Sequence, residues 1–172
     1  MPVYALGLQV PNIHPDAYIA PEAVIIGSVT IGAESSIWPG AVLRGDDGDI
    51  FIGARTSIQD GAVLHTTPSF PTTVGDECVV GHLAHLEGCI VHDAALVGSG
   101  SVVLHRAVVE TGALVGAGAV VSGGTVVPTG SMALGIPAKI RPDCVTPDMI
   151  SLGMQSYVDR GRRYRAELRR ID

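Results

Sequence analysis

The sequence predicts an all-β fold: a parallel β-helix of hexapeptide repeats, followed by a C-terminal α-helix. Three observations predict it. Aliphatic residues recur at intervals of six, and a helix-start signal stands near the end of the chain. The 172 residues are 47% hydrophobic but only 4% aromatic, with 22 glycines and 11 prolines. Such a composition argues against intrinsic disorder and against a helical bundle, and it suits a narrow aliphatic core with many bends.

The repeat is clearest in the second half of the chain, where seven valines stand six residues apart: Val91, Val97, Val103, Val109, Val115, Val121 and Val127. An earlier series runs from Ile13 to Leu43, and small residues follow four places after most aliphatic ones. A period of six fits neither a strand nor a helix alone. It indicates a short strand and a bend, three per coil, with coils stacked at about 4.8 Å. Glycines are expected at the bends, namely Gly32, Gly53, Gly75, Gly98 and Gly116.

The repeat is interrupted in three places. Residues 45–51 (GDDGDIF) include three extra residues. Residues 66–73 (TTPSFPTT) lie between Leu64 and Val74, which are ten residues apart instead of six. One residue is missing between Leu86 and Val91. Insertions in repeat proteins often carry function, so these positions are candidates for a site.

The chain divides into a β-helix domain over residues 1–145 and a helical segment over residues 146–172. Thr146 suits an N-cap, Pro147 the first helical position and Asp148 the first turn. We expect an amphipathic helix lying on the coils, with a partner-binding helix as the alternative. Its apolar positions are Met149, Ile150, Leu152, Tyr157, Tyr164 and Leu168, and its six arginines between Arg160 and Arg170 are expected to form a solvated face.

Charge and composition narrow the function classes. The formal net charge is −6, which does not suit a nucleic-acid-binding protein. No apolar run is long enough for a membrane helix, and no secretory signal is visible, so no membrane partner is expected. Three cysteines without a CxxC pair favour a reducing cytoplasm. Cys89 is expected to be a small packing residue.

Counting every third repeat places chemically active side chains in one outward column. Arg44, His65 and Glu87 share a face of the prism, and Asp60 lies above His82 on the preceding face. His65, His82, His85 and Glu87 are metal-ligand types, although such a group can also be merely solvated. His14, His92 and His105 are expected to be structural.

The spacing of these residues predicts an oligomer. His82 and Glu87 are five residues apart on a nearly extended chain, up to roughly 16 Å. Zinc ligands lie about 2 Å from the ion, so a site that uses both residues needs two chains. A three-fold assembly is the natural closure for a triangular prism.

At these residues the sequence resembles the gamma-class carbonic anhydrase family. The resemblance is carried by SIWPGAVLRGDDG (36–48), IQDGAVLH (58–65) and VGHLAHLEGC (80–89). LGIPAK (134–139) adds less, since many hexapeptide-repeat acyltransferases share it. The resemblance implies a left-handed parallel β-helix and a homotrimer with Zn2+, or alternatively Fe2+ or Co2+, at each subunit interface. It implies reversible hydration of CO2 to bicarbonate by hydroxide on that metal.

The resemblance also assigns roles residue by residue. His65 matches the first metal ligand, and His82 matches the second, which comes from the adjacent subunit. Arg44 and Asp46 match a pair that holds the subunits together. Gln59 and Asp60 match two residues that orient the metal-bound water and its neighbours. Asp47 matches a proton-transfer residue.

The third ligand departs from the family pattern. The family has a histidine five residues after the second ligand, where this chain has Glu87. Either Glu87 binds the metal, or His85 does so with Glu87 as a hydrogen-bond acceptor. We favour His85, because a carboxylate ligand should raise the pKa of metal-bound water.

Two other functions remain open. An acyl-CoA-dependent acyltransferase, with His85 as general base, would fit the repeat and LGIPAK. A catalytically inactive metal-binding trimeric scaffold would fit the change at Glu87.

Overall fold

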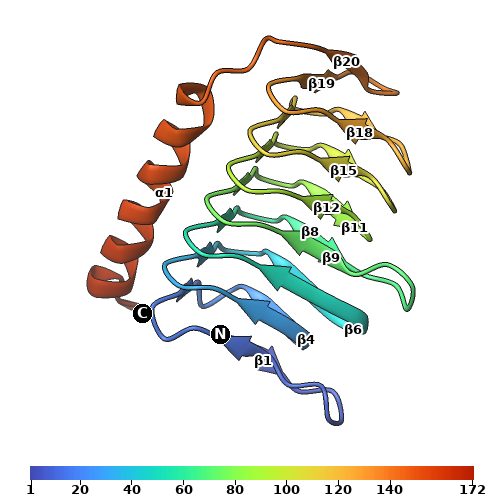
Figure 1. Cartoon of the computed structure of the whole chain (residues 1–172). Helices are drawn as coiled ribbons and strands as arrows, with labels where there is room; N and C mark the ends of the chain where they lie inside the picture. Colours follow the sequence, from blue (N-terminus) through green and yellow to red (C-terminus); the bar gives the residue numbers. More distant parts are fainter.

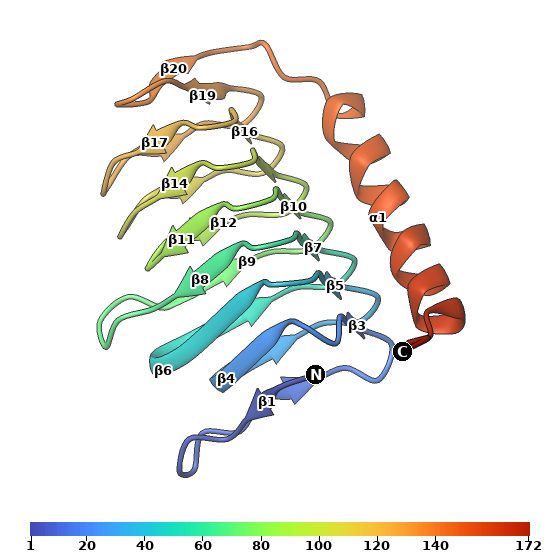
Figure 2. The same ribbon diagram turned by 180° about the vertical axis from the view of Figure 1, so that it is seen from behind.

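A computed structural model describes all 172 residues and confirms the parallel β-helix with one C-terminal helix, α1 (Asp148–Glu167) (Figures 1 and 2). All strand pairs except β19–β20 are parallel. The strands are β1 (Val3–Tyr4), β2 (Asn12–Ile13), β3 (Tyr18–Ile19), β4 (Val24–Ile31), β5 (Ser36–Ile37), β6 (Val42–Ile52), β7 (Ser57–Ile58), β8 (Val63–His65), β9 (Thr72–Val74), β10 (Val79–Val80), β11 (His85–Glu87), β12 (Ile90–Val91), β13 (Leu96–Val97), β14 (Val102–Val103), β15 (Val108–Val109), β16 (Leu114–Val115), β17 (Val120–Val121), β18 (Val126–Val127), β19 (Met132–Leu134) and β20 (Lys139–Arg141).

The strands form two sheets. One has 12 strands and covers two faces of the prism, because β4 and β6 run unbroken from one face to the next. The other has eight strands, in the order β20-β19-β16-β13-β10-β7-β5-β3, and forms the face against which α1 lies. The 12-stranded sheet therefore meets itself at one edge of the prism, on the side away from α1 (Figure 2).

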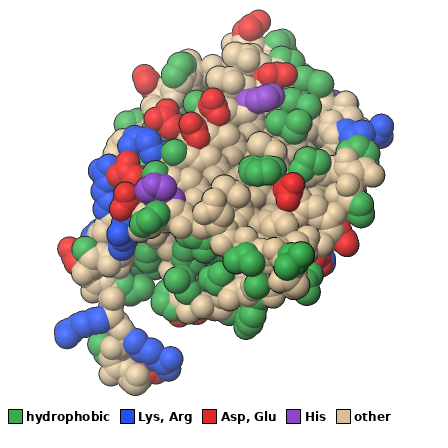
Figure 3. Space-filling model, turned by 60° about the horizontal axis from the view of Figure 1, so that its bottom comes forward, with side chains coloured by type: hydrophobic (Ala, Val, Ile, Leu, Met, Phe, Trp, Pro, Cys, Tyr) green, Lys and Arg blue, Asp and Glu red, His purple; other side chains and the backbone are tan.

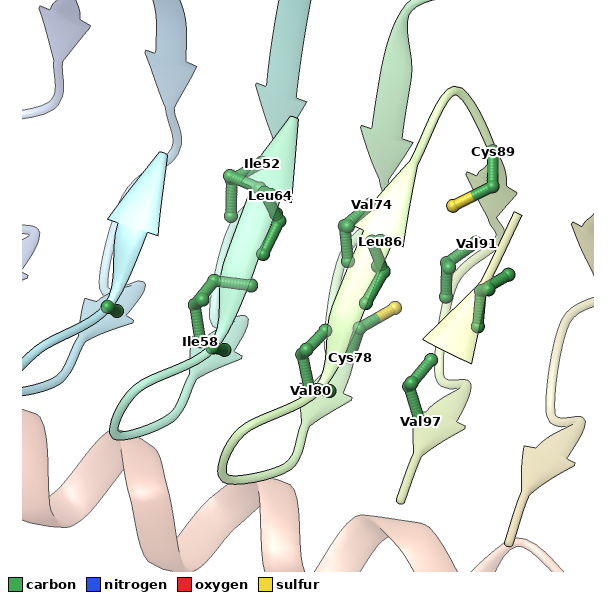
Figure 4. Close-up of a cluster of buried hydrophobic side chains, with 14 of the residues drawn as sticks. Ile52, Ile58, Leu64, Val74, Cys78, Val80, Leu86, Cys89, Val91 and Val97 are labelled. Atoms are coloured by element: carbon green, nitrogen blue, oxygen red, sulfur yellow. The ribbon is translucent and has the colours of Figure 1, made fainter. Parts of the chain in front are cut away.

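The core is the predicted column of aliphatic residues. Ile25, Leu43, Leu64 and Leu86 stack through β4, β6, β8 and β11, and each is completely buried. Figure 4 shows the middle of this column, with side chains from all three faces pointing toward one another. Fully burying one such side chain stabilises the fold by about 1.5–3 kcal/mol, so the stack needs few aromatic residues.

The cysteines of the core are packing residues, as predicted for Cys89. Cys78 and Cys89 are completely buried, and Cys144 is exposed; all three are free thiols. Burial raises the pKa of both buried thiols to about 12. They remain protonated at neutral pH and are poor nucleophiles.

The bends differ from the prediction. Gly32 and Gly53 do not have positive φ; instead they allow coils to stack closely, because a Cβ on Gly32 would lie 2.6 Å from the carbonyl carbon of Gly53. Positive φ occurs at other corners, for example at Gly61 (67°) and at Leu83 (59°) one coil later. The periodic glycines thus include some that serve coil stacking rather than chain reversal.

Helix α1 buries only part of the predicted apolar set, with Ile150 buried and Tyr157 packed against the core. Ile150, Met154, Val158 and Gly161 are buried, and their spacing of four, four and three residues places them on one side of the helix. The predicted apolar residues Met149 and Leu152 face solvent, with 48% and 75% of their surface exposed. Small size at Gly161 matters more than hydrophobicity there, because the helix passes close to Ser36 and Tyr18.

The start of α1 lies one residue from the prediction. Pro147, rather than Thr146, is the N-cap, and no side chain caps the helix. The Thr146 carbonyl still accepts a bond from the Met149 N–H at 3.0 Å.

The arginines of α1 lie on its solvated side and partly tie it to the coils. Arg162 contacts Glu34, and Arg165 contacts Asp16 at 3.1 Å. Figure 3 shows acidic and basic side chains intermixed along one side of the molecule, with hydrophobic side chains gathered on the lower part of the face. No helix of the chain is long and apolar enough to cross a membrane.

Two of the interruptions and the N-terminal turn gather at the edge away from α1. Residues 45–51 lengthen β6, and residues 66–73 form a protruding loop with a bridge between Thr67 and Phe70 (Figure 2). From the N-terminal turn, the Gln9 side chain donates a hydrogen bond to the Asp46 carbonyl at 3.2 Å. The irregular segments therefore surround the strand ends that carry His65 and Glu87.

Candidate metal centre

The predicted outward column is present. Arg44 of β6 pairs in register with His65 of β8, and His65 pairs with Glu87 of β11. Each side chain follows a buried leucine on its strand, so the alternation of strand residues turns it away from the core. Repeat counting therefore placed these three residues correctly.

The His65 ring lies between two carboxylates. Its Nδ1 is 3.1 Å from Glu87 Oε1, and its Nε2 is 3.3 Å from Asp46 Oδ1. Asp46 is also paired with Arg44 through its other oxygen. Only 17% of the His65 side chain is exposed, so the column holds this imidazole in one orientation.

The carboxylates of Asp46 and Glu87 remain ionised at pH values below the range in which such groups usually titrate, because both pKa values are lowered. Burial works to raise the pKa of Asp46, but hydrogen bonds from Arg44 and the backbone outweigh it and lower that pKa. Burial also works to raise the pKa of Glu87, and hydrogen bonds from His65 and His85 outweigh it and lower that pKa. The edge therefore presents negative charge to a cation.

Glu87 is the centre of a second set of contacts. Its Oε2 lies 3.3 Å from His85 Nε2, and its Oε1 lies 3.6 Å from His105 Nε2. The His105 nitrogen is buried and has no hydrogen-bond partner. The ring packs beside Phe70 of the inserted loop, with ring centroids 6.0 Å apart. His105 thus belongs to the cluster, contrary to the expectation that it is merely structural.

The residues around His65 fit a divalent cation. His65, Asp46 and Asp47 can each offer one ligand atom, and these atoms lie within 4.8 Å of one another. One imidazole and two carboxylates form a donor set that suits zinc and several first-row metals. Asp47 is the exposed member of the group. His85 lies instead against the far oxygen of Glu87.

His82 lies at a different corner, as the counting predicted. Its Nδ1 is 2.9 Å from Asp60 Oδ2, and its Nε2 is 3.4 Å from the hydroxyl of Tyr157 on α1. The side chain is 47% exposed and makes no contact with His65 or Glu87 of the same chain. Gln59, beside Asp60, is almost completely buried.

The site is an open edge rather than a pocket of one chain. Three hollows, of about 480, 450 and 420 Å3, lie beside the ends of α1 and include none of the clustered histidines.

Comparison with known proteins supports a close relationship over nearly the whole chain. A family model described as bacterial transferase hexapeptide (six repeats) matches residues 11–45. A carbonic anhydrase from Geobacillus kaustophilus is 40% identical over 166 residues, covering 95% of this chain and 91% of the relative. The carnitine operon protein CaiE from Citrobacter koseri is 36% identical over 170 residues, covering 98% and 86%.

A solved structure agrees with the fold. The Bacillus cereus BC4754 gene product, provisionally described as an acetyltransferase, superimposes with a TM-score of 0.94 at 35% identity and covers 96% of this chain and 98% of its own. The six-residue repeat, the coil stack and the similarity to these relatives all indicate the same family. The chain belongs to the gamma-class carbonic anhydrase family of hexapeptide-repeat proteins.

Proposed function

We propose that this protein is a metal-dependent enzyme of the carbonic anhydrase type, which hydrates CO2 reversibly to bicarbonate. The observation that carries the proposal is the group of His65, Asp46 and Asp47, whose ligand atoms lie within 4.8 Å of one another at the end of the Arg44–His65–Glu87 column. The similarity to a carbonic anhydrase over 95% of the chain supports it.

The proposal includes a homotrimer with shared sites. His65 of one copy would bind the metal together with His82 of a second copy, and Asp46 supplies the oxygen nearest to His65 Nε2, at 3.3 Å. The 47% exposure of His82 and its separation from the His65 group support this arrangement, since a ligand for another copy must be reachable from outside. Zn2+ is the first choice, with Fe2+ and Co2+ as alternatives.

When bound, the metal would supply a hydroxide near neutral pH by lowering the pKa of a water towards ~7. The chain would supply the rest. Arg44 fixes Asp46 against His65, and the exposed Asp47 can pass a proton to solvent. Gln59 and Asp60 would orient the reacting oxygen and its neighbours. The open edge suits a substrate as small as CO2.

The test is stopped-flow hydration of CO2 by metal-loaded protein. We expect His65→Ala to lower the rate at least ~100-fold, because a site that loses a metal ligand loses its metal-activated nucleophile. His92→Ala is the matched control, since His92 is exposed and lies outside the cluster. If both variants keep the wild-type rate, or if the wild type has none, the proposal is wrong.

A second candidate is acyl transfer from an acyl-CoA. The 35% identity and TM-score of 0.94 with the Bacillus cereus protein favour it. His85, partly exposed beside Glu87, would act as the general base. Thermal stabilisation by acetyl-CoA but not by Zn2+ would favour this candidate, whereas the reverse would favour the hydratase.

A further inference from the structure

We propose that Glu87 is a positioning residue whose carboxylate accepts the Nδ1–H of His65 and thereby leaves Nε2 free for a divalent cation. The inference deepens the proposed function and depends on it. It assigns Glu87 a role behind the imidazole, whereas the sequence alone left open whether Glu87 or His85 binds the metal.

The contacts fix the direction of this hydrogen bond. Glu87 Oε1 lies 3.1 Å from His65 Nδ1, and an ionised carboxylate can only accept, so the nitrogen must donate. Asp46 Oδ1 lies 3.3 Å from Nε2 and accepts from that nitrogen in the same way when it carries a proton, so the cation decides between the two. Asp46 and Asp47 form the group that fits a cation on the Nε2 side, and a cation there takes the Nε2 lone pair and leaves the one N–H of the neutral ring at Nδ1, facing Glu87.

The corner of His82 provides an independent parallel. There Asp60 Oδ2 lies 2.9 Å from Nδ1, so both imidazoles assigned to the metal are held by a carboxylate at the same ring atom. In each case the carboxylate comes from a neighbouring coil: Asp60 precedes His82, and Glu87 follows His65.

Glu87 is itself held in place. His85 contacts one of its oxygens at 3.3 Å, and His105 lies 3.6 Å from the other. Phe70 of the inserted loop packs beside His105, so the loop at residues 66–73 supports the site indirectly. Partners of this kind orient a metal-bound histidine, and their removal typically weakens metal binding 10–100-fold.

The first experiment measures the tautomer of His65 directly. Full-length protein labelled with 15N-histidine is studied by NMR without metal at about pH 8.5, where ordinary imidazoles are neutral. We expect Nδ1 of His65 to carry a proton in the wild type. Glu87→Ala should shift His65 towards the Nε2–H form, while Glu87→Gln, whose amide oxygen can still accept, should retain much of the wild-type pattern.

The second experiment measures Zn2+ affinity by competition with a chelator. Glu87→Ala should bind Zn2+ 10–100-fold more weakly than the wild type, and Glu87→Gln should recover part of that loss. Glu110→Ala is the matched control, because the Glu110 side chain makes no hydrogen bond or ion pair. Unfolding curves of each variant establish that the fold is retained.

The outcomes separate this inference from the proposed function. If Glu87→Ala leaves both the His65 tautomer and the Zn2+ affinity unchanged in a protein that binds Zn2+, the inference is wrong and the metal site stands. If the wild type binds none of Zn2+, Fe2+ and Co2+, the proposed function is wrong and the inference falls with it. A change of tautomer together with weaker Zn2+ binding supports both.

Discussion

His65 and His82 occupy two corners of the same coil stack and differ in how they are enclosed. His65 lies between Glu87 and Asp46 at the edge of the 12-stranded sheet, with 17% of its side chain exposed. His82 is 47% exposed and contacts only Asp60 and the hydroxyl of Tyr157. Both rings are held at Nδ1 by a carboxylate, yet only one has further ligand types around Nε2.

The difference indicates that a single chain carries two separate parts of a site: an enclosed part at His65 with carboxylates beside it, and an exposed part at His82. A largely enclosed imidazole with nearby carboxylates can receive a cation, whereas an exposed imidazole can enter a neighbour's site. The two corners therefore suit an assembly in which each site takes His65 from one copy and His82 from the next.

The largest expected effect is at the exposed corner. His82→Ala should abolish stoichiometric metal binding and reduce CO2 hydration at least ~100-fold, because one ligand of every shared site is lost. In metal-free protein, the free energy of unfolding should change by less than about 0.5 kcal/mol, since His82 is a surface residue. Elemental analysis, stopped-flow kinetics and urea unfolding check this. Full metal content in His82→Ala would show that His65 needs no second copy.

The next effect concerns the helix that supports only the His82 corner. A Cβ on Gly161 would lie 3.4 Å from the Ser36 Cβ, so alanine fits and a larger side chain does not. Gly161→Leu should destabilise the protein by about 1–3 kcal/mol through overpacking. Gly161→Ala should be neutral or stabilising by up to about 1 kcal/mol. Urea unfolding measures both, and equal stability of the two variants would contradict the packing described for α1.

Acid should weaken the His65 corner through Glu87. The pKa of Glu87 is lowered in the folded chain, so its stabilising contribution is complete above the unfolded pKa of about 4.3. That contribution is lost as pH falls through the folded pKa. In metal-free protein, the stability difference between wild type and Glu87→Gln should therefore be larger at pH 7 than at pH 3. A stability difference between the two proteins that is the same at pH 7 and pH 3 would contradict the lowered pKa of Glu87.

The smallest effect is expected from Tyr157→Phe. The hydroxyl lies 3.4 Å from His82 Nε2, and a bond of that length contributes about 0.5–1 kcal/mol at most. Zn2+ affinity should change less than ~5-fold, in contrast with the 10–100-fold loss expected for Glu87→Ala. A larger change would mean that α1, rather than Asp60, holds His82 in position.

Repeat counting predicted the fold and the main column because each coil has a fixed length. Leu64 and Leu86 occupy equivalent positions in successive coils, so the residues that follow them, His65 and Glu87, must stack. The same counting placed Asp60 beside His82. These predictions needed only the period of the chain and the alternation of side chains along a strand.

Counting did not reveal His105 or the buried face of α1. The missing residue between Leu86 and Val91 makes a tight corner at Gly88, beside which the His105 ring lies, and only the three-dimensional path shows this. On the helix, a count of apolar positions leaves out Gly161, whose lack of a side chain permits close packing. Both misses depend on local geometry rather than on periodicity.

Co-expression of two inactive variants tests the shared site most directly. If each site joins His65 of one copy to His82 of the next, a mixed trimer of His65→Ala and His82→Ala chains has an intact pair at one of its three interfaces. We expect mixed trimers, purified through two different tags, to recover metal and CO2 hydration to about a third of the wild type. Recovery no greater than that of either variant alone would contradict a site built from two copies.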